Sequence, residues 1–79
     1  MTETLKDLRV GESGRVTGYD PAGKVYRRRL LAMGLTRGTS FSVTRLAPMG
    51  DPVEIRVRGF ALTLRREEAS SLFVEKIES

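Results

Sequence analysis

The chain has 79 residues, 39% of them apolar, which suits one small domain and predicts a single domain over residues 1–79. It contains neither Cys nor His, so the sequence excludes disulfides, thiolate metal sites and the side chains that most often serve as general bases or transition-metal ligands. We therefore expect a protein that is not an enzyme and has no catalytic, cofactor-binding or metal-binding residues.

Membrane insertion and export are not expected either. The longest apolar run, Leu30–Met33, is far shorter than the roughly 20 residues that span a bilayer. The N-terminal residues lack the basic and apolar segments of a signal peptide. The sequence thus predicts a cytoplasmic location.

Charge is divided along the chain. Lys and Arg number 14 against 10 Asp and Glu, for a net charge of +4. Residues 24–66 hold ten basic and two acidic side chains and carry +8, whereas the two ends together carry −4. Eleven of the 14 cations are Arg, which makes bidentate contacts with carboxylate or phosphate. The pattern indicates either an electropositive binding face or a solvated surface that maintains solubility.

The first third of the chain predicts a turn, a strand and a helix. Residues 4–8 have apolar side chains three apart and form one helical turn that buries both leucines. Arg15–Tyr19 alternates as a strand. Asp20 followed by proline is a typical helix start, so a helix is expected over residues 21–33.

The expected helix is amphipathic and has a defined end. Tyr26, Leu30 and Met33 share one apolar face, and the cations lie largely elsewhere. Gly34 follows in a left-handed conformation, and Leu35 then contacts Leu30 as in a Schellman motif.

The second half predicts mainly strands. A turn over residues 36–39 leads into a strand around residues 41–44, and residues 47–52, with two prolines, form a rigid exposed loop. The clearest signal follows, in which Val53–Val57 and Phe60–Leu64 alternate as a hairpin. All three phenylalanines are assigned to the core. A helical turn at residues 66–70 and a last strand over residues 72–77 complete the chain.

One pattern occurs twice. The order Leu-x-x-Gly-x-Ser-x-x-Val-Thr is found at residues 8–17 and again at residues 35–44. Two copies are too few for a repeat architecture, so we interpret them as one turn-into-strand device used twice.

These elements favour a mainly β fold with one α-helix. About five short strands leave two open edges unless the sheet curls, and closure hides them. We expect a small SH3-like or OB-like β-barrel with the helix inserted between the first and second strands.

Four segments resemble one family. They are Arg29–Thr39, Ala47–Pro52, Val57–Arg65 and Glu68-Ala69, and together with flanking positions the match runs from Leu8 to Val74. In this order and spacing they are similar to the ferrous iron transport protein A (FeoA) family. The family often has Pro before the glycine of the second turn, where this chain has Arg37, which is expected to loosen that turn slightly.

The resemblance implies an SH3-like barrel that supports a FeoB-type ferrous iron transporter, whose N-terminal cytoplasmic portion is a GTPase domain. We expect the chain to bind that portion at the inner membrane and to aid Fe(II) uptake without chemistry or a cofactor. The candidate contact residues lie on the helix and in the 47–52 loop: Arg27, Arg28, Arg29, Leu31, Pro48, Met49 and Asp51.

These assignments have alternatives. The arginines equally fit a solvated helix face, and Leu31 is favoured for the core. Met49, at a loop tip, has no obvious core to fill and fits a partner contact as well as a solvated position. Exposed strand edges permit a homo-oligomer.

Metal ions and nucleic acid are two other possible ligand classes. Fe(II) binding is not expected, because Glu67 and Glu68 are the sole adjacent carboxylates and are interpreted as charges that favour a helix start. Nucleic acid is a weaker alternative, since small basic barrels stack bases on aromatic side chains and the core assignments leave Tyr19 alone for that role.

Overall fold

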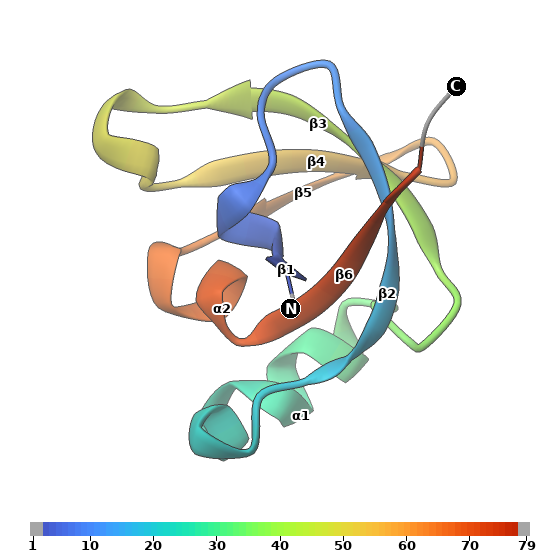
Figure 1. Ribbon diagram of the computed structural model, residues 1–79, viewed down its shortest axis with the longest axis vertical. Coiled ribbons are helices and arrows are strands. Elements are labelled where there is room, and N and C mark those ends of the chain that lie inside the picture. The colour runs from blue at the N-terminus through green and yellow to red at the C-terminus, as the bar shows by residue number, and fades with distance from the viewer. Residues whose placement is uncertain (1–2, 78–79) are drawn as a thin grey trace.

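The computed structural model describes residues 3–77 and contains one antiparallel sheet that curls around a core, with α1 across one end (Figure 1). The sheet has six strands in the order β1-β6-β2-β3-β4-β5. Its strands are β1 (Glu3–Thr4), β2 (Ser13–Tyr19), β3 (Ser40–Leu46), β4 (Val53–Val57), β5 (Phe60–Leu64) and β6 (Leu72–Ile77). The helices are α1 (Lys24–Ala32) and α2 (Arg66–Ser70), with short 3-10 turns η1 (Leu5–Asp7), η2 (Pro21–Gly23) and η3 (Pro48–Gly50).

The mainly β architecture is as expected, with one strand more than the sequence indicated. The additional strand, β1, has two residues and pairs with β6 at Phe73 and Val74. The helix lies between the first two predicted strands, which are now β2 and β3. Its first turn is the 3-10 turn η2, where the Asp20 carboxylate accepts the Ala22 N–H at 2.9 Å.

The repeated turn-into-strand pattern is confirmed, and its two copies are joined to each other. Gly11 and Gly38 both have positive φ, at 92° and 88°, and each precedes a strand. The Gly11 N–H donates to the Val43 carbonyl at 2.9 Å, and the Gly38 N–H donates to the Val16 carbonyl at 2.8 Å. Each copy therefore satisfies backbone groups of the other, which holds β2 against β3.

The end of α1 also follows the prediction. Gly34 has φ 89°, the Leu35 N–H donates to the Leu30 carbonyl at 3.1 Å, and the Gly34 N–H donates to the Leu31 carbonyl at 3.0 Å. This is the paired bonding of a Schellman motif. It buries Leu30 and Leu35 completely, so the helix is anchored at its C-terminal end.

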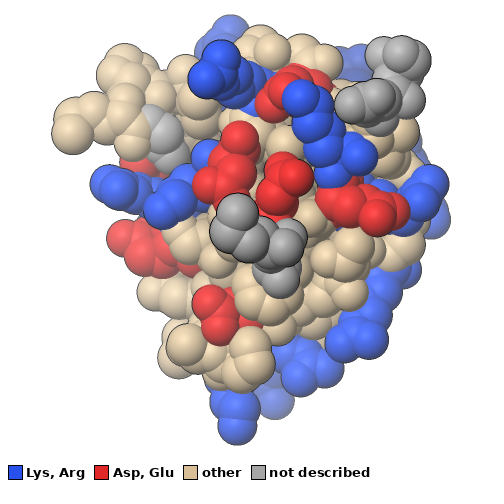
Figure 2. Space-filling view, in the orientation of Figure 1, with Lys and Arg blue, Asp and Glu red and all other residues tan. Residues whose placement is uncertain are grey.

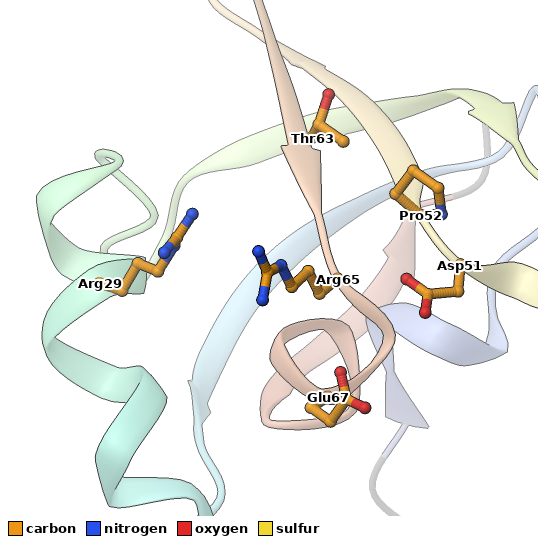
Figure 3. A pocket seen from close by; sticks show the side chains of 6 residues that line it. All are labelled: Arg29, Asp51, Pro52, Thr63, Arg65 and Glu67. Carbon is orange, nitrogen blue, oxygen red and sulfur yellow. The ribbon is translucent and has the colours of Figure 1, made fainter.

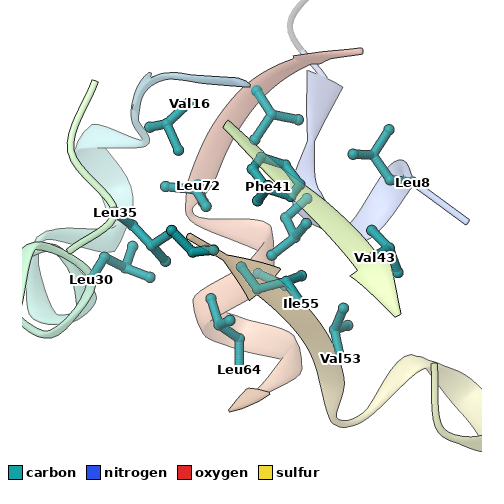
Figure 4. Close-up of a cluster of buried hydrophobic side chains, with 14 residues drawn as sticks. Leu8, Val16, Leu30, Leu35, Phe41, Val43, Val53, Ile55, Leu64 and Leu72 are labelled. Carbon is teal, nitrogen blue, oxygen red and sulfur yellow. The ribbon is translucent and has the colours of Figure 1, made fainter. Parts of the chain in front are cut away.

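The core is built from alternate residues of the strands, which lie on one face of the sheet, together with residues of η1, α1, α2 and the loops (Figure 4). Its buried apolar residues are Leu5, Leu8, Val16, Leu30, Leu35, Phe41, Val43, Val53, Ile55, Val57, Leu64, Ala69, Leu72 and Val74. Tyr26 and Met33 pack against it from α1, as their spacing predicted.

Two core assignments were wrong, and a third failed in part, because Phe73 is half-buried and lies outside the core cluster. Phe60 is 71% exposed, because it is the first residue after the hairpin turn and projects beyond the core that Leu64 reaches from the same strand. Leu31 is 41% exposed, because it follows Leu30 by one position, about 100° around the helix, and so points away from the buried face.

Candidate interaction surface

An ion pair joins the two helices and shapes the surface between them. The Glu68 side chain is 3% exposed, and its Oε2 lies 2.7 Å from Nε of Arg29. Its Oε1 accepts the Arg65 N–H at 2.8 Å, so the carboxylate also caps the start of α2. The expected role of Glu68 at a helix start is confirmed, whereas its pairing with α1 had no signal in the sequence.

A hollow lies beside this ion pair at the end of β5, with Arg29 of α1 on one side and Asp51 and Pro52 on the other (Figure 3). It is lined by Arg29, Asp51, Pro52, Thr63, Arg65 and Glu67. The Arg65 side chain extends toward α1 and Arg29, while Asp51 lies on the far side of β5 (Figure 3). Asp51 is also tied to α2, because its Oδ1 accepts the Arg66 N–H at 3.2 Å.

Two of the predicted contact residues, Arg29 and Asp51, line this hollow together. Thr63, Arg65 and Glu67 also line it and were not predicted as contact residues. The sequence places Thr63 and Arg65 in or next to an alternating strand, whereas their nearness to Arg29 of α1 depends on the fold. The only sequence feature that pointed to this hollow was Arg65, a charged residue directly after a predicted strand.

The outer side of α1 carries the other predicted residues. The guanidinium carbon of Arg27 lies 5.4 Å from the centre of the Tyr19 ring, a cation–π arrangement, and the Tyr19 hydroxyl donates to the Leu35 carbonyl at 2.7 Å. Tyr19 is therefore half-buried and covered by Arg27. Arg28 and Leu31 are exposed.

The loop after β3 presents Pro48 and Met49. Met49 is 89% exposed and has φ 66°, which is unusual for a residue with a side chain. The expectation of an exposed loop is confirmed. Neither Pro48 nor Met49 lines the hollow that contains Arg29 and Asp51.

A second, more apolar hollow lies farther along β5, between the C-terminal end of α1 and the β4–β5 hairpin. Its lining residues are Ala32, Met33, Gly34, Val57, Arg58, Phe60, Ala61 and Leu62. The sequence reading missed this hollow because it assigned Phe60 to the core. The position of Phe60 next to the tight Arg58-Gly59 turn was the signal that could have placed it on the surface.

Acidic and basic side chains meet on one face of the molecule, where Arg15 pairs with Glu75 and Lys76 with Glu12. Figure 2 shows the face on which β6 and β2 lie in front, with acidic side chains near its centre and basic side chains around its margin. Among residues 3–77, no cluster of three or more Asp, Glu, His or Cys could hold a metal ion. In the same range, no helix is long and apolar enough to cross a bilayer.

Comparisons with known proteins agree on one family. A family model described as the FeoA domain matches residues 3–76. The Fe(2+) transport protein A/Fe(2+) transporter FeoB fusion protein of Porphyromonas gingivalis is 36% identical over 75 residues, which are 95% of this chain and 9% of that protein. The chain thus spans less than a tenth of the length of that curated relative.

Solved structures support the same grouping. The FeoA-like protein of Clostridium acetobutylicum is 35% identical with a TM-score of 0.88, over 99% of this chain and 90% of that chain. FeoA of Stenotrophomonas maltophilia, an SH3 domain protein solved with zinc, is 26% identical with a TM-score of 0.78, over 92% and 89% of the two chains. The expected SH3-like fold and the resemblance noted in the sequence are confirmed.

Proposed function

Because the chain belongs to the FeoA family of ferrous iron transport, we propose that it is a non-catalytic interaction module that binds the cytoplasmic side of a FeoB-type Fe(II) transporter. The observation that carries the proposal is the fusion protein of Porphyromonas gingivalis, in which the two components are one polypeptide. Covalent linkage raises the effective concentration of one component at the other, which benefits partners that associate.

The surface that we propose for this contact is the outer side of α1 together with the loop around η3. Arg28 and Leu31 are exposed on α1, and Arg27 and Arg29 flank them with their side chains held by Tyr19 and Glu68. Held side chains lose less entropy on binding than free ones. The proposed surface also includes three residues of the loop: Pro48, Met49 and Asp51. Among them, Met49 is exposed and has a flexible apolar side chain.

The partner portion that we propose is the cytoplasmic GTPase domain of the transporter, with the chain in the cytoplasm at the inner membrane. The basic outer side of α1 suits an acidic patch on such a domain. No step of bond chemistry is assigned to the chain, whose sequence contains neither Cys nor His.

Calorimetry with the purified GTPase domain of the cognate transporter, at low and physiological salt, tests this proposal. We expect saturable binding that weakens with salt and that the charge reversal Arg28→Glu weakens by about tenfold or more. Arg9→Glu is the matched control, because Arg9 is exposed in the acidic N-terminal part of the chain.

Two outcomes count against the proposal. No heat at either salt would exclude the GTPase domain as the partner. Equal losses for Arg28→Glu and Arg9→Glu would exclude the outer side of α1 as the contact surface and leave general electrostatic attraction.

A further inference from the structure

Strand β5 forms one edge of the sheet. It stands last in the strand order and pairs with β4 alone, from Val57↔Phe60 to Val53↔Leu64. Within residues 3–77, no backbone hydrogen bond joins Ala61 or Thr63 to a further strand or to a helix.

The hairpin turn fixes which backbone groups of β5 face outward. Arg58 and Gly59 have φ 50° and 87°, the two positive values of a type I′ turn. In a two-residue turn of this kind the flanking residues, here Val57 and Phe60, form a hydrogen-bonded pair, and bonded pairs recur at every second residue. Ala61 and Thr63 fall between them, so their N–H and C=O groups point away from β4.

The outward edge is accessible along its length. One hollow lies at the Thr63 end of β5, with Arg29 on one side and Asp51 and Pro52 on the other (Figure 3). The second lies beside Ala61, where Ala32, Met33 and Gly34 line it together with the hairpin. The side chains of Ala61 and Thr63 are small and exposed, so they do not cover the backbone. The edge and its two hollows are called the β5 groove below.

Apolar and basic side chains surround the hairpin end of the β5 groove. Phe60 is 71% exposed, and Met33 and Leu62 line the floor beside it. Arg58 lines the same hollow, and Arg56 stands opposite Ala61 in the register. An occupant of this end must therefore bring apolar side chains and a negative charge.

We propose that β5 accepts, as an added strand, an extended segment of a partner protein that alternates apolar residues with Asp or Glu and places a carboxylate beside Arg58. Backbone hydrogen bonds to Ala61 and Thr63 supply affinity, while the apolar pocket at Phe60 and the cation at Arg58 select the sequence. This inference does not rest on the proposed function. The groove shares Arg29 and Asp51 with the surface proposed for the transporter, but the groups that select the segment, Phe60 and Arg58, lie outside that surface, and the inference holds for any partner that carries such a segment.

A second copy of the chain is a less favourable occupant. Its own β5 could add to the edge through the same backbone groups. It would, however, bring Arg56, Arg58 and Arg65 against the same three cations, and like charges oppose that pairing.

The probe for the test is a synthetic peptide of eight residues that alternates valine and glutamate, blocked at both ends and titrated into the full chain labelled with ¹⁵N. We expect the amide signals of Ala61 and Thr63 to shift and their hydrogen exchange to slow at peptide concentrations up to about 1 mM. The same peptide with lysine in place of glutamate should bind about tenfold or more weakly.

Two variants sharpen the test. Thr63→Pro removes an outward N–H without removing a bond to β4, and proline is tolerated on such an edge, so it should lower the peptide affinity about tenfold while the fold is retained. Arg58→Glu keeps every backbone group and should reverse the preference between the glutamate and lysine peptides. Arg9→Glu serves as the charge-matched control and should leave that preference unchanged.

Several results would overturn the proposal. These are no shift at Ala61 and Thr63 at about 1 mM peptide, shifts confined to other strands, or equal binding of the two peptides. Concentration-dependent shifts of the same amides without peptide would assign the edge to a second copy. Tighter binding of oligothymidylate than of the glutamate peptide, with shifts at Phe60, would assign it to single-stranded nucleic acid.

Discussion

The two edges of the sheet are built differently. At one edge, β1 has two residues, and its Thr4 is tied locally because both its N–H and its hydroxyl donate to the Asp7 carboxylate, at 2.9 and 3.2 Å. The completely buried Leu5 follows at once. At the other edge, β5 has five residues, outward backbone groups at Ala61 and Thr63, and an exposed Phe60.

The difference shows how a small sheet protects one edge and keeps the other available. An edge strand that is short and followed by a buried turn presents few backbone N–H and C=O groups with which another strand could pair. An edge as long as β5, without proline or a bulge between Phe60 and Leu64, is a template for pairing. The basic side chains around β5 repel a second copy of the same edge and attract an acidic partner.

The largest predicted difference between the two edges is in stability. Leu5→Ala should lower the free energy of unfolding by about 2–5 kcal/mol, because it empties space in the core beneath the β1 edge. Phe60→Ala removes a larger side chain but should cost less than about 1 kcal/mol, because that side chain is mostly in solvent. Urea denaturation of both variants measures the contrast.

Leu62→Ala, at a half-buried position of β5, is the intermediate control and should fall between the two. Similar losses for Leu5→Ala and Phe60→Ala would mean that the hairpin tip is packed as firmly as the core, and the contrast between the edges would fail.

The sequence predicted features that depend on neighbouring residues and missed those that depend on residues far apart in the chain. The Schellman end at Gly34 and the Arg58-Gly59 hairpin are local, so short patterns determine them. The alternation of β5 was also correct, but alternation assigns a residue to a face and does not say whether the core extends to that point. Phe60 lies beyond it.

Contacts between distant segments had no comparable signal. The pairing of β1 with β6 involves two residues, too few for a pattern, and the ion pair of Arg29 with Glu68 joins separate helices. For the same reason the sequence could select Arg29 for its place on the predicted helix and Asp51 for its place in the 47–52 loop, but it could not show the hollow that both share with Thr63 and Arg65.

The second prediction concerns the turn that precedes β5. Arg58 adopts φ 50°, a conformation that asparagine tolerates better than arginine, so Arg58→Asn should raise the free energy of unfolding by about 0.5–1 kcal/mol. The same variant removes the cation from the β5 groove and should weaken binding of the glutamate peptide. A gain in stability with a loss of binding is typical of a position kept for interaction.

Arg56→Asn is the control for this pair of measurements, because Arg56 lies within β4 and has no positive φ. It should leave stability unchanged or slightly reduced. A gain of the same size there would attribute the effect to lower net charge, and the backbone at Arg58 would no longer explain it.

The smallest predicted effect is electrostatic and lies at the protected side of the sheet. Glu12, in the segment between η1 and β2, forms an ion pair with Lys76 of β6 and accepts the Arg9 N–H at 2.7 Å. The bond to Lys76 first, and then the bond from Arg9, hold the pKa of Glu12 below its usual value. Since the folded pKa is lowered, the stabilisation is complete above the unfolded pKa and is lost as the pH falls through the folded one.

Glu12→Gln removes this titration, so the variant should lose less stability than the parent chain between about pH 4.3, the ordinary pKa of glutamate, and pH 2. Thermal unfolding measured across that interval should give two curves that converge as the pH falls. Curves that stay parallel would show that the ion pair between Glu12 and Lys76 does not stabilise this side of the sheet. The protection of the β1 side would then rest on its short strand and on Leu5.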